Sequence, residues 1–284
     1  MGSADDLLSQ RFSVKRVVDG HSERVLDEVA TEQPLQIRIG YWFKDVHANE
    51  SLAVTMRTPG DDRELAAGFL LAEGVITSAN EIDSIRLLGA DPSFGAKPSN
   101  EIAVELARGI DFEAWRLARV SFANSSCGLC GKRSREAIAQ HAPPLAENFR
   151  VDRSLIMKLP QLLRQHQEGF AKTGGLHAAA LVDGTGRIEA AFEDIGRHNA
   201  LDKLIGATLL RDRIPLADRL ILLSSRSSFE LVQKALMAGA PILATVGAPS
   251  SLAIEAAREH GLTLIGFIHD GQFNLYSGEW RIDS

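Results

Sequence analysis

Residues Leu220–Ser250, LILLSSRSSFELVQKALMAGAPILATVGAPS, decide the fold of this chain of 284 residues. An aliphatic run that ends in serines predicts a buried strand over Leu220–Ser224. Apolar residues at helical spacing predict a helix over Phe229–Ala238, and a second aliphatic run predicts a strand over Pro241–Val246. Strand–helix alternation of this kind is typical of a largely parallel sheet that helices cover.

The same alternation continues on both sides of this stretch. Strands are expected at Leu176–Val182, Arg187–Glu193 and Leu262–Ile268, helices at Asn199–Leu210 and Leu252–His260, and an edge strand at Phe273–Tyr276. A helical pattern over Leu155–Gln167 contains Pro160, which should divide it into two pieces. The fold class is therefore α/β.

The first third of the chain has a different pattern, with short strands and one helix. Strands are expected at Arg24–Ala30, Leu35–Ile39, Ser51–Arg57, Ile82–Leu88 and Glu101–Leu106. After Pro59-Gly60, Asp61 or Asp62 should cap a helix that ends at Gly74. We expect a small α+β domain over residues 1–120 and the larger α/β domain over residues 121–284.

Composition excludes several classes of protein. The net charge of −6 argues against a nucleic-acid or membrane-surface binder. No run approaches the ~18 apolar residues of a membrane helix. The acidic N-terminus lacks the apolar run of a signal peptide, and two cysteines do not make a disulfide framework. We expect a cytoplasmic protein with reduced thiols.

Both cysteines, Cys127 and Cys130, lie in the stretch Asn124–Ser134, NSSCGLCGKRS. Neighbouring cations would favour the thiolate, and the flanking glycines would leave the sulfurs accessible. We expect a mobile loop over residues 122–133. Half of a zinc site, a dithiol redox pair and a structural role are all open, but exposure, mobility and nearby cations favour a nucleophilic or sulfur-carrying cysteine.

Three junctions between strands and helices carry polar residues: 193–199, 224–228 and 247–251. In an α/β sheet such junctions gather at the carboxyl ends of the strands, where helix N-termini attract anions. Arg197 and Arg226 could add charge-assisted hydrogen bonds to phosphate. The alternatives are N-capping by Ser227 or Ser250 and a surface position for Arg197. The glycines match neither a Walker nor a dinucleotide fingerprint.

Several of these motifs together resemble the FdhD family, the formate dehydrogenase accessory sulfurtransferases. The motifs are Arg57–Gly60, Glu64–Leu70, SCGLCG at Ser126–Gly131, TGGLHAAAL at Thr173–Leu181, EDIGRHNALDK at Glu193–Lys203 and the Ser225–Lys234 segment. They occur in the right order over nearly the whole chain, which makes the resemblance far more specific than a lone Cys-x-x-Cys.

The resemblance implies a cytoplasmic homodimer that accepts sulfur from a cysteine desulfurase. Cys127 would carry it as a persulfide beside Cys130 and pass it to the molybdenum or tungsten bis(pterin guanine dinucleotide) cofactor, the bound substrate, before that cofactor serves formate dehydrogenase. No catalytic metal of its own, no nucleic acid and no membrane are expected. The α/β domain would be a cytidine-deaminase-like three-layer α/β/α domain, although the deaminase zinc signature is absent.

The resemblance and the polar junctions together indicate where the cofactor binds. The expected cofactor-binding residues are Phe267, Ile268, His269, Asp270, Gly271, Gln272, Ser225, Arg226, Ser228, His177, Asp194, Arg197, His198 and Asn199. His177 could instead be a satisfied core histidine. Gln272 stands where family members often have arginine, and Thr245–Ala248 replaces a serine- and arginine-rich loop. These departures should weaken phosphate binding or change the preferred cofactor form. A non-catalytic cofactor chaperone is the alternative function.

Overall fold

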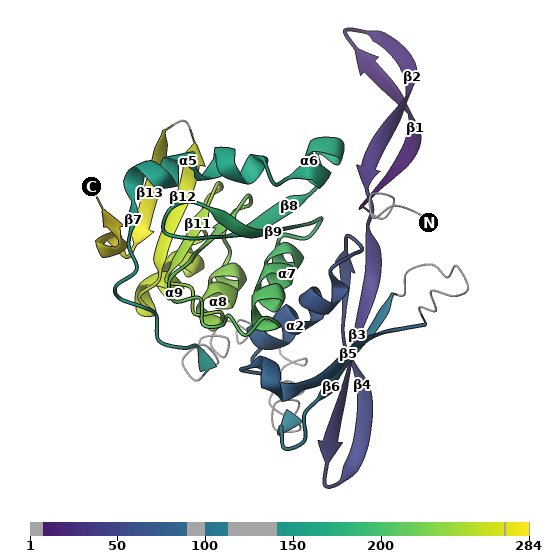
Figure 1. Cartoon of the computed structure of the whole chain (residues 1–284). Coiled ribbons are helices and arrows are strands. Elements are labelled where there is room, and N and C mark those ends of the chain that lie inside the picture. Colours follow the sequence, from purple (N-terminus) through teal and green to yellow (C-terminus); the bar gives the residue numbers. More distant parts are fainter. Residues whose placement is uncertain (1–7, 90–99, 113–140, 270, 284) are drawn as a thin grey trace.

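The computed structural model describes residues 8–89, 100–112, 141–269 and 271–283. Its largest element is a six-stranded sheet (Figure 1). In spatial order the strands are β13 (Gln272–Ser277), β12 (Thr263–His269), β11 (Ile242–Thr245), β10 (Leu220–Leu223), β8 (His177–Val182) and β9 (Ile188–Asp194). The alternation of strands and helices expected from the last third of the sequence is confirmed.

The direction of the strands differs from the expectation of a largely parallel sheet. Only the pairs β10–β11 and β11–β12 are parallel. β8 is antiparallel to β10, and the pairs β8–β9 and β12–β13 are antiparallel hairpins. Strands joined by a short turn must reverse direction, whereas the parallel strands are joined through helices.

Helices cover both faces of this sheet, so the domain has three layers (Figure 1). On one face, α7 (Arg197–Leu209), α8 (Phe229–Met237) and α9 (Ser251–Glu259) pack on alternate strand residues such as Leu181 and Ile221. On the other face, α5 (Arg153–Arg164) packs on the intervening residues, such as Val182. The four inner strands, β12, β11, β10 and β8, are largely buried on both sides, which explains their continuous aliphatic character.

Pro160 does not divide the helical segment in the way the sequence predicts. α5 runs unbroken from Arg153 to Arg164 with Pro160 inside it, and a separate helix α6 (Glu168–Thr173) follows. Ile156, Leu159 and Leu163 of α5 are buried against the sheet. Their burial outweighs the lost backbone hydrogen bond of the proline.

The N-terminal part contains a second, four-stranded sheet. Its order is β4 (Val46–Arg57), β3 (Gln33–Phe43), β6 (Glu101–Leu106) and β5 (Ile82–Leu88), the last preceded by the 3₁₀ turn η1 (Ala79–Glu81). One face of this sheet packs against α2 (Asp62–Ala72).

The ends of α2 agree only in part with the expected caps. Gly74 has a positive φ of 70° and ends the helix as expected. Asp61 occupies the N-cap position, but its side chain makes no capping hydrogen bond. The neighbouring Asp62 instead forms a buried ion pair with Arg57, with an Nε–Oδ1 distance of 2.8 Å.

Two glycines allow α2 and α7 to cross in direct backbone contact. A Cβ atom on Gly68 would lie 1.9 Å from the Asp202 carbonyl oxygen, and one on Gly206 would lie 1.8 Å from the Glu64 carbonyl oxygen. No side chain fits at either position. One buried apolar cluster therefore continues from the four-stranded sheet through α2 to α7, α8 and α9. The expected domain boundary near residue 120 stays a prediction.

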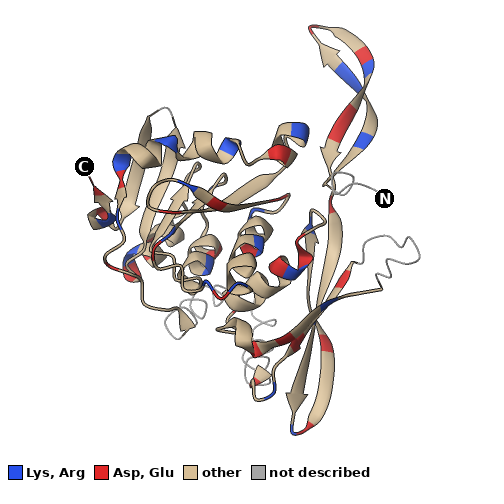
Figure 2. Ribbon diagram, in the orientation of Figure 1, with Lys and Arg blue, Asp and Glu red and all other residues tan. Residues whose placement is uncertain are grey.

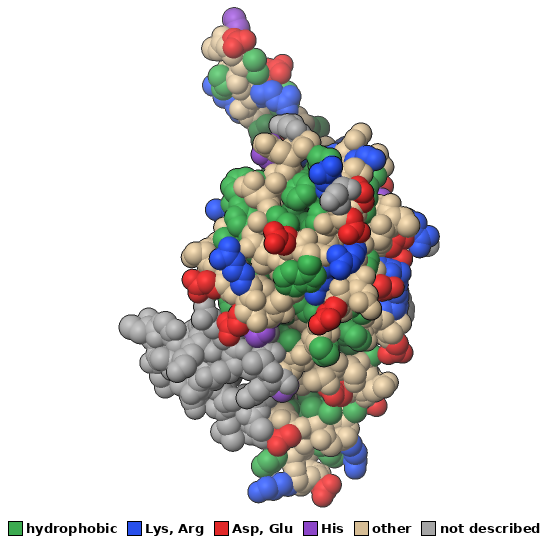
Figure 3. Space-filling view, turned by 90° about the vertical axis from the view of Figure 1, so that its left-hand side faces the viewer, with side chains coloured by type: hydrophobic (Ala, Val, Ile, Leu, Met, Phe, Trp, Pro, Cys, Tyr) green, Lys and Arg blue, Asp and Glu red, His purple; other side chains and the backbone are tan. Residues whose placement is uncertain are grey.

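A two-stranded ribbon, β1 (Ser9–Val18) with β2 (His21–Ala30), projects from the body (Figure 1). Phe12, Val18 and Val29 are exposed on one of its faces and Val17 and Leu26 on the other. Figure 2 shows both acidic and basic residues along it. Figure 3, which views the molecule from the left-hand side of Figure 1, shows the ribbon above a face where hydrophobic and charged side chains are intermixed.

A small C-terminal element completes the fold. After β13, the 3₁₀ turn η3 (Glu279–Arg281) leads into β14 (Ile282–Asp283), which pairs in parallel with β7 (Val151–Asp152). This places the C-terminal residues beside the start of α5. Within the described residues, no helix combines the length and apolar character needed to cross a bilayer.

Candidate functional site

The polar junctions predicted from the sequence meet at one edge of the six-stranded sheet, as expected. The backbone N–H of Gly247 donates to the Ser225 carbonyl (3.1 Å), and that of Ser250 donates to the Ser227 carbonyl (2.9 Å). Phe267 N–H donates to the Gly247 carbonyl (3.2 Å). Backbone hydrogen bonds therefore connect the loops that follow β10, β11 and β12. We call residues 224–228, 247–251 and 267–269 the rim.

Two helices begin at this rim and direct their N-terminal amides toward it. Ser250 caps α9 by accepting a hydrogen bond from Ala253 N–H at 3.2 Å, which confirms the N-cap alternative for this serine. Ser228 occupies the N-cap position of α8 without a side-chain capping bond. The positive ends of two helix dipoles thus lie at the same edge.

The buried serine Ser227 does not act as a cap. It is 1% exposed, and its hydroxyl oxygen has no hydrogen-bond partner among the described residues. A buried hydroxyl without a partner is costly, so this atom is suited to meet a ligand. Ser225 is also buried, but its hydroxyl donates to the Arg226 carbonyl (2.9 Å).

Arg226 is exposed at the rim, and no ion pair of its guanidinium is found among the described residues. The Cβ of any larger residue at Gly247 would lie 2.8 Å from the Arg226 side chain, so Gly247 makes room for this arginine. Among the described residues, this arrangement places a cation without an ion-pair partner next to the N-terminus of α8.

Asp194 lies at the end of β9, directly opposite His177 in the register, but it is wholly buried. One oxygen accepts from Gly196 N–H (2.8 Å) and Asn199 Nδ2 (3.1 Å); the other accepts from Thr58 N–H (3.1 Å) and lies 2.9 Å from Lys203 Nζ. With its oxygens so engaged, Asp194 positions the rim rather than facing a ligand.

Asn199 has the same kind of role in this geometry. Its amide nitrogen donates to the Met56 carbonyl (2.7 Å) as well as to Asp194, and its amide oxygen accepts from Thr55 (3.0 Å). Asp194 and Asn199 therefore fasten the start of α7 to the end of β4. The expectation that these two side chains contact the cofactor has no support in these contacts.

His177, Arg197 and His198 form a half-buried group beside the rim. Burial, followed by the nearby Arg197 cation, lowers the pKa of His177, so its imidazole is neutral near pH 7. His198 Nε2 lies 3.3 Å from Ser228 Oγ and 3.0 Å from the Glu230 carboxylate. The Arg197 Nε atom is buried without a hydrogen-bond partner among the described residues.

A cavity of about 320 Å³ opens next to this group. His177, Ser224 and Val246 line it from the sheet, and Phe170 and Gln167 line it from α6 and the turn before that helix. The Arg164 guanidinium stacks 4.6 Å from the centre of the Phe170 ring. The cavity is lined by apolar and aromatic side chains together with a few polar groups, as small-molecule sites are.

The C-terminal stretch expected to bind cofactor also reaches the rim. Phe267 has a φ of 54°, and its side chain is 41% exposed. His269 pairs with Gln272 across the β12–β13 hairpin, and Gln272 Nε2 lies 3.4 Å from the His269 ring nitrogens. Ile268 is buried, and Gly271 has a φ of 74° at the turn. Asp270 lies outside the described residues.

The structure explains the threonine at position 245, where the family resemblance led us to expect a serine- and arginine-rich loop. Thr245 is wholly buried, and its hydroxyl oxygen lies 3.0 Å from the carbonyl oxygens of both Gly247 and Ile265, to either of which it can donate. This residue holds β11, its loop and β12 together.

Cys127 and Cys130 lie outside the described residues. Within the described residues, no three His, Cys, Asp or Glu side chains cluster as metal ligands would.

Sequence reasoning missed Lys203 and Thr58, which join the Asp194 network. Lys203 is 1% exposed and also donates to the Thr58 carbonyl (3.0 Å). Thr58 Oγ1 accepts from Ile195 N–H (3.1 Å). Glu193 was also missed as an anchor: its carboxylate accepts from Gly169 N–H (2.7 Å) and Phe170 N–H (2.8 Å) at the start of α6. A lysine within an apolar helix segment is the signal that could have revealed Lys203.

Together these features define a class of protein: a mixed α/β fold with an anion-receptive rim and an adjoining small-molecule cavity. Comparison of the chain with known protein families identifies its family. The model of the FdhD/NarQ family matches residues 30–283, and the chain belongs to this family.

Several curated relatives are similar over almost their whole length. A "Sulfur carrier protein FdhD" of Streptomyces avermitilis is 43% identical over 282 residues, covering 97% of this chain and 96% of the relative. The protein of the same name from Saccharolobus solfataricus is 40% identical over 273 residues, covering 96% and 98%. A solved structure of a candidate formate dehydrogenase accessory protein from Desulfotalea psychrophila has a TM-score of 0.74 and 24% identity, covers 97% of this chain and 100% of its own, and supports the fold.

Proposed function

We propose that this protein is a sulfur carrier that matures formate dehydrogenase. Membership of the FdhD/NarQ family, together with relatives named as sulfur carrier proteins, supports sulfur transfer. The Cys-x-x-Cys pair supplies the thiols, and Cys127 is the carrier. The donor is a cysteine desulfurase, the acceptor is the molybdenum or tungsten bis(pterin guanine dinucleotide) cofactor of formate dehydrogenase, and the protein works as a cytoplasmic homodimer.

The loading step is an exchange between two sulfur centres. The Cys127 thiolate attacks the terminal sulfur of the desulfurase persulfide, a new S–S bond forms on Cys127, and the donor cysteine leaves as a thiolate. Loading therefore consumes no net electrons. Delivery of the sulfur as sulfide requires two electrons, and attack by the Cys130 thiolate on Cys127 would supply them by leaving a disulfide. Lys132, Arg133 and Arg135 would favour the thiolate form of these cysteines.

The rim is the part of the molecule suited to the phosphates of the cofactor. Two helix N-termini converge there, Arg226 has no described ion-pair partner, and the buried polar atoms of Ser227 and Arg197 lack hydrogen bonds among the described residues. Phosphate oxygens would satisfy each of these groups. The cavity between His177 and Phe170 would take a ring of the same ligand. The residues present therefore fit a phosphate-rich dinucleotide.

Intact-mass measurement tests the carrier role. The protein is incubated with a cysteine desulfurase and cysteine, with omission of the desulfurase as the control. We expect the mass of one added sulfur atom, its removal by a thiol reductant, and its absence in Cys127→Ser. Cys130→Ser should still load sulfur, because the exchange requires one thiol only.

A second measurement separates the carrier from a chaperone. Binding of GDP, as a fragment of the cofactor, is measured for the same Cys127→Ser protein. Retained GDP binding with normal sulfur loading of the wild type supports the proposal. Retained GDP binding without any sulfur loading of the wild type would instead indicate a non-catalytic cofactor chaperone.

A further inference from the structure

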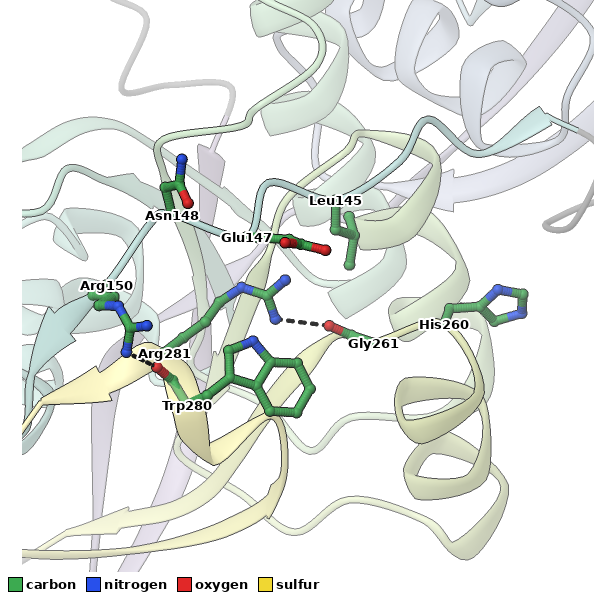
Figure 4. Close-up of a pocket in the computed structure, with 8 residues that line it drawn as sticks. All are labelled: Leu145, Glu147, Asn148, Arg150, His260, Gly261, Trp280 and Arg281. Atoms are coloured by element: carbon green, nitrogen blue, oxygen red, sulfur yellow. Dashed lines mark hydrogen bonds between the residues drawn. The ribbon is translucent and has the colours of Figure 1, made fainter.

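The polar groups of the larger cavity, of about 500 Å³ beside Gly261, hold parts of the protein together (Figure 4). The Arg281 guanidinium donates to the carbonyl oxygens of Ala146 (2.9 Å) and Gly261 (2.7 Å). Arg150 donates to the Trp280 carbonyl. These bonds fasten the C-terminal 3₁₀ turn to the segment before β7 and to the turn after α9, so they serve the fold.

The smaller cavity, of about 320 Å³ between His177 and Phe170, has a wall that depends on a short helix. Phe170 lines the cavity from α6, and the Arg164 guanidinium of α5 lies 4.6 Å from the centre of its ring. α6 has six residues, of which only Gly169 is buried. A helix this short is not stable in water on its own. The position of the Phe170 ring therefore depends on what holds α6.

The first turn of α6 is capped by a residue from another element. Its own N-cap residue, Gln167, makes no side-chain capping hydrogen bond among the described residues. The Glu193 carboxylate, on β9, takes that place: one oxygen accepts from Gly169 N–H (2.7 Å) and the other from Phe170 N–H (2.8 Å). A carboxylate at this end of a helix satisfies free N–H groups and interacts favourably with the helix dipole. α6 also contacts β2 of the ribbon.

A glycine in α6 leaves room for this carboxylate. A Cβ atom on Gly169 would lie 3.1 Å from Glu193 Oε2 and 2.5 Å from Leu176 Cδ1. Any side chain at this position would push α6 away from Glu193. The close contact between helix and carboxylate therefore requires both residues.

Glu193 and its chain neighbour Asp194 act on opposite faces of β9, because successive side chains of a strand alternate. Asp194 binds Thr58 and Lys203 on the side of α7, whereas Glu193 binds α6. Two successive residues thus fix the start of α7, next to the rim, and the start of α6, next to the cavity.

We propose that Glu193 is a positioning residue for the cofactor: by capping α6 it holds the Phe170 ring where a ring of the ligand stacks on it. This inference rests on the proposed function, in which the rim holds the phosphates and this cavity holds a ring of the same ligand. Aromatic rings stack with centroids roughly 4.5–7 Å apart. Displacement of α6 would therefore remove the ring contact while the rim keeps its phosphate contacts, and binding would weaken without being abolished.

Calorimetric titration of the full chain with GDP tests the proposal. Glu193→Gln replaces one acceptor oxygen by an amide group that donates toward a backbone N–H, and should weaken GDP affinity roughly tenfold. Glu189→Gln is the matched control, because it makes the same change on the same strand and loses ion pairs with Arg213 and Arg219. It should leave GDP affinity unchanged.

Phe170→Ala supplies a measurement that a purely structural role of Glu193 would not move. If Glu193 acts through the Phe170 ring, Glu193→Gln should weaken GDP binding much less in the Phe170→Ala background than in the wild type. Gly169→Ala crowds the same contact from the side of the helix and should weaken GDP binding severalfold. It replaces Glu193→Gln in the comparison if circular dichroism shows that Glu193→Gln does not fold.

Weaker GDP binding that is coupled to Phe170→Ala and absent from Glu189→Gln supports the proposal. Unchanged GDP affinity, an equal loss in Glu189→Gln, or equal losses with and without the Phe170 ring would overturn the positioning role and leave the proposed function intact. Absence of GDP binding by the wild type would instead count against the rim as the phosphate site, and the positioning role would fall with it.

Discussion

Replacing Lys203 by methionine is the sharpest test of how the rim is held in place. The lysine and its partner Asp194 are 1% and 0% exposed, and their charged atoms are 2.9 Å apart. Methionine has a similar shape, so the substitution removes the charge and leaves little empty space. Removing one partner of a buried pair typically costs 3–5 kcal/mol. Asp194 keeps three other donors, from Thr58, Gly196 and Asn199, so we expect about 3 kcal/mol.

The assay is urea unfolding followed by far-ultraviolet circular dichroism. Lys158→Met on the exposed side of α5 is the matched control, and we expect it to change the free energy of unfolding by less than about 0.5 kcal/mol. In an Asp194→Ala background, Lys203→Met should cost much less, because no carboxylate is left unpaired. A loss below about 1 kcal/mol for Lys203→Met, or equal losses in both backgrounds, would refute the reasoning.

Three further predictions concern packing, pH and ligand binding. Gly206→Ala should destabilise the protein by several kcal/mol or prevent folding, measured by thermal unfolding, because its Cβ would meet the Glu64 carbonyl oxygen at 1.8 Å. Arg219 and Arg213 lower the pKa of Glu189 to about 2, so the Glu189 carboxylate stabilises the fold above its unfolded pKa and loses this effect as pH falls toward 2. Glu189→Gln should therefore cost about 1–2 kcal/mol at pH 7 and much less near pH 2, and an equal loss at both pH values would contradict this. Arg226→Gln should weaken GDP binding about tenfold in calorimetry with normal thermal stability, and unchanged affinity would argue against the rim as the phosphate site.

The elements of the six-stranded sheet could be predicted because each carries a local signal. The aliphatic runs at β10 and β11 and the amphipathic pattern of α8 specify their own conformation. Strand direction is not a local property. β8 is antiparallel to β10 because of how the chain crosses the sheet, and no residue within either strand indicates this.

Pro160 shows how packing overrides a local rule. Proline disfavours a helix interior through one lost hydrogen bond and one steric clash. The apolar face of α5 is buried along the helix on both sides of that proline, with Ile156 before it and Leu163 after it. The sequence contains this pattern, but the strength of the packing depends on the sheet beneath it.

The location of the candidate site could be predicted from the sequence more accurately than the contacts of its individual side chains. Charged and polar residues after strands reach the rim, because the fold brings the carboxyl ends of parallel strands together. Whether a given side chain faces the ligand or the interior depends on distant residues. Asp194 and Asn199 turn inward because Thr55, Met56, Thr58 and Lys203 offer them partners.

The glycine crossing of α2 and α7 has a consequence for experiments that divide the chain. A fragment that begins at residue 141 would expose the face of α7 that α2 normally covers and would lose the Thr58 groups that pair with Asp194 and Lys203. Neither piece should be stable alone. Co-expressed as residues 1–112 and 141–284, the two pieces should recombine without a covalent link, since the helix contact itself supplies the recognition between them.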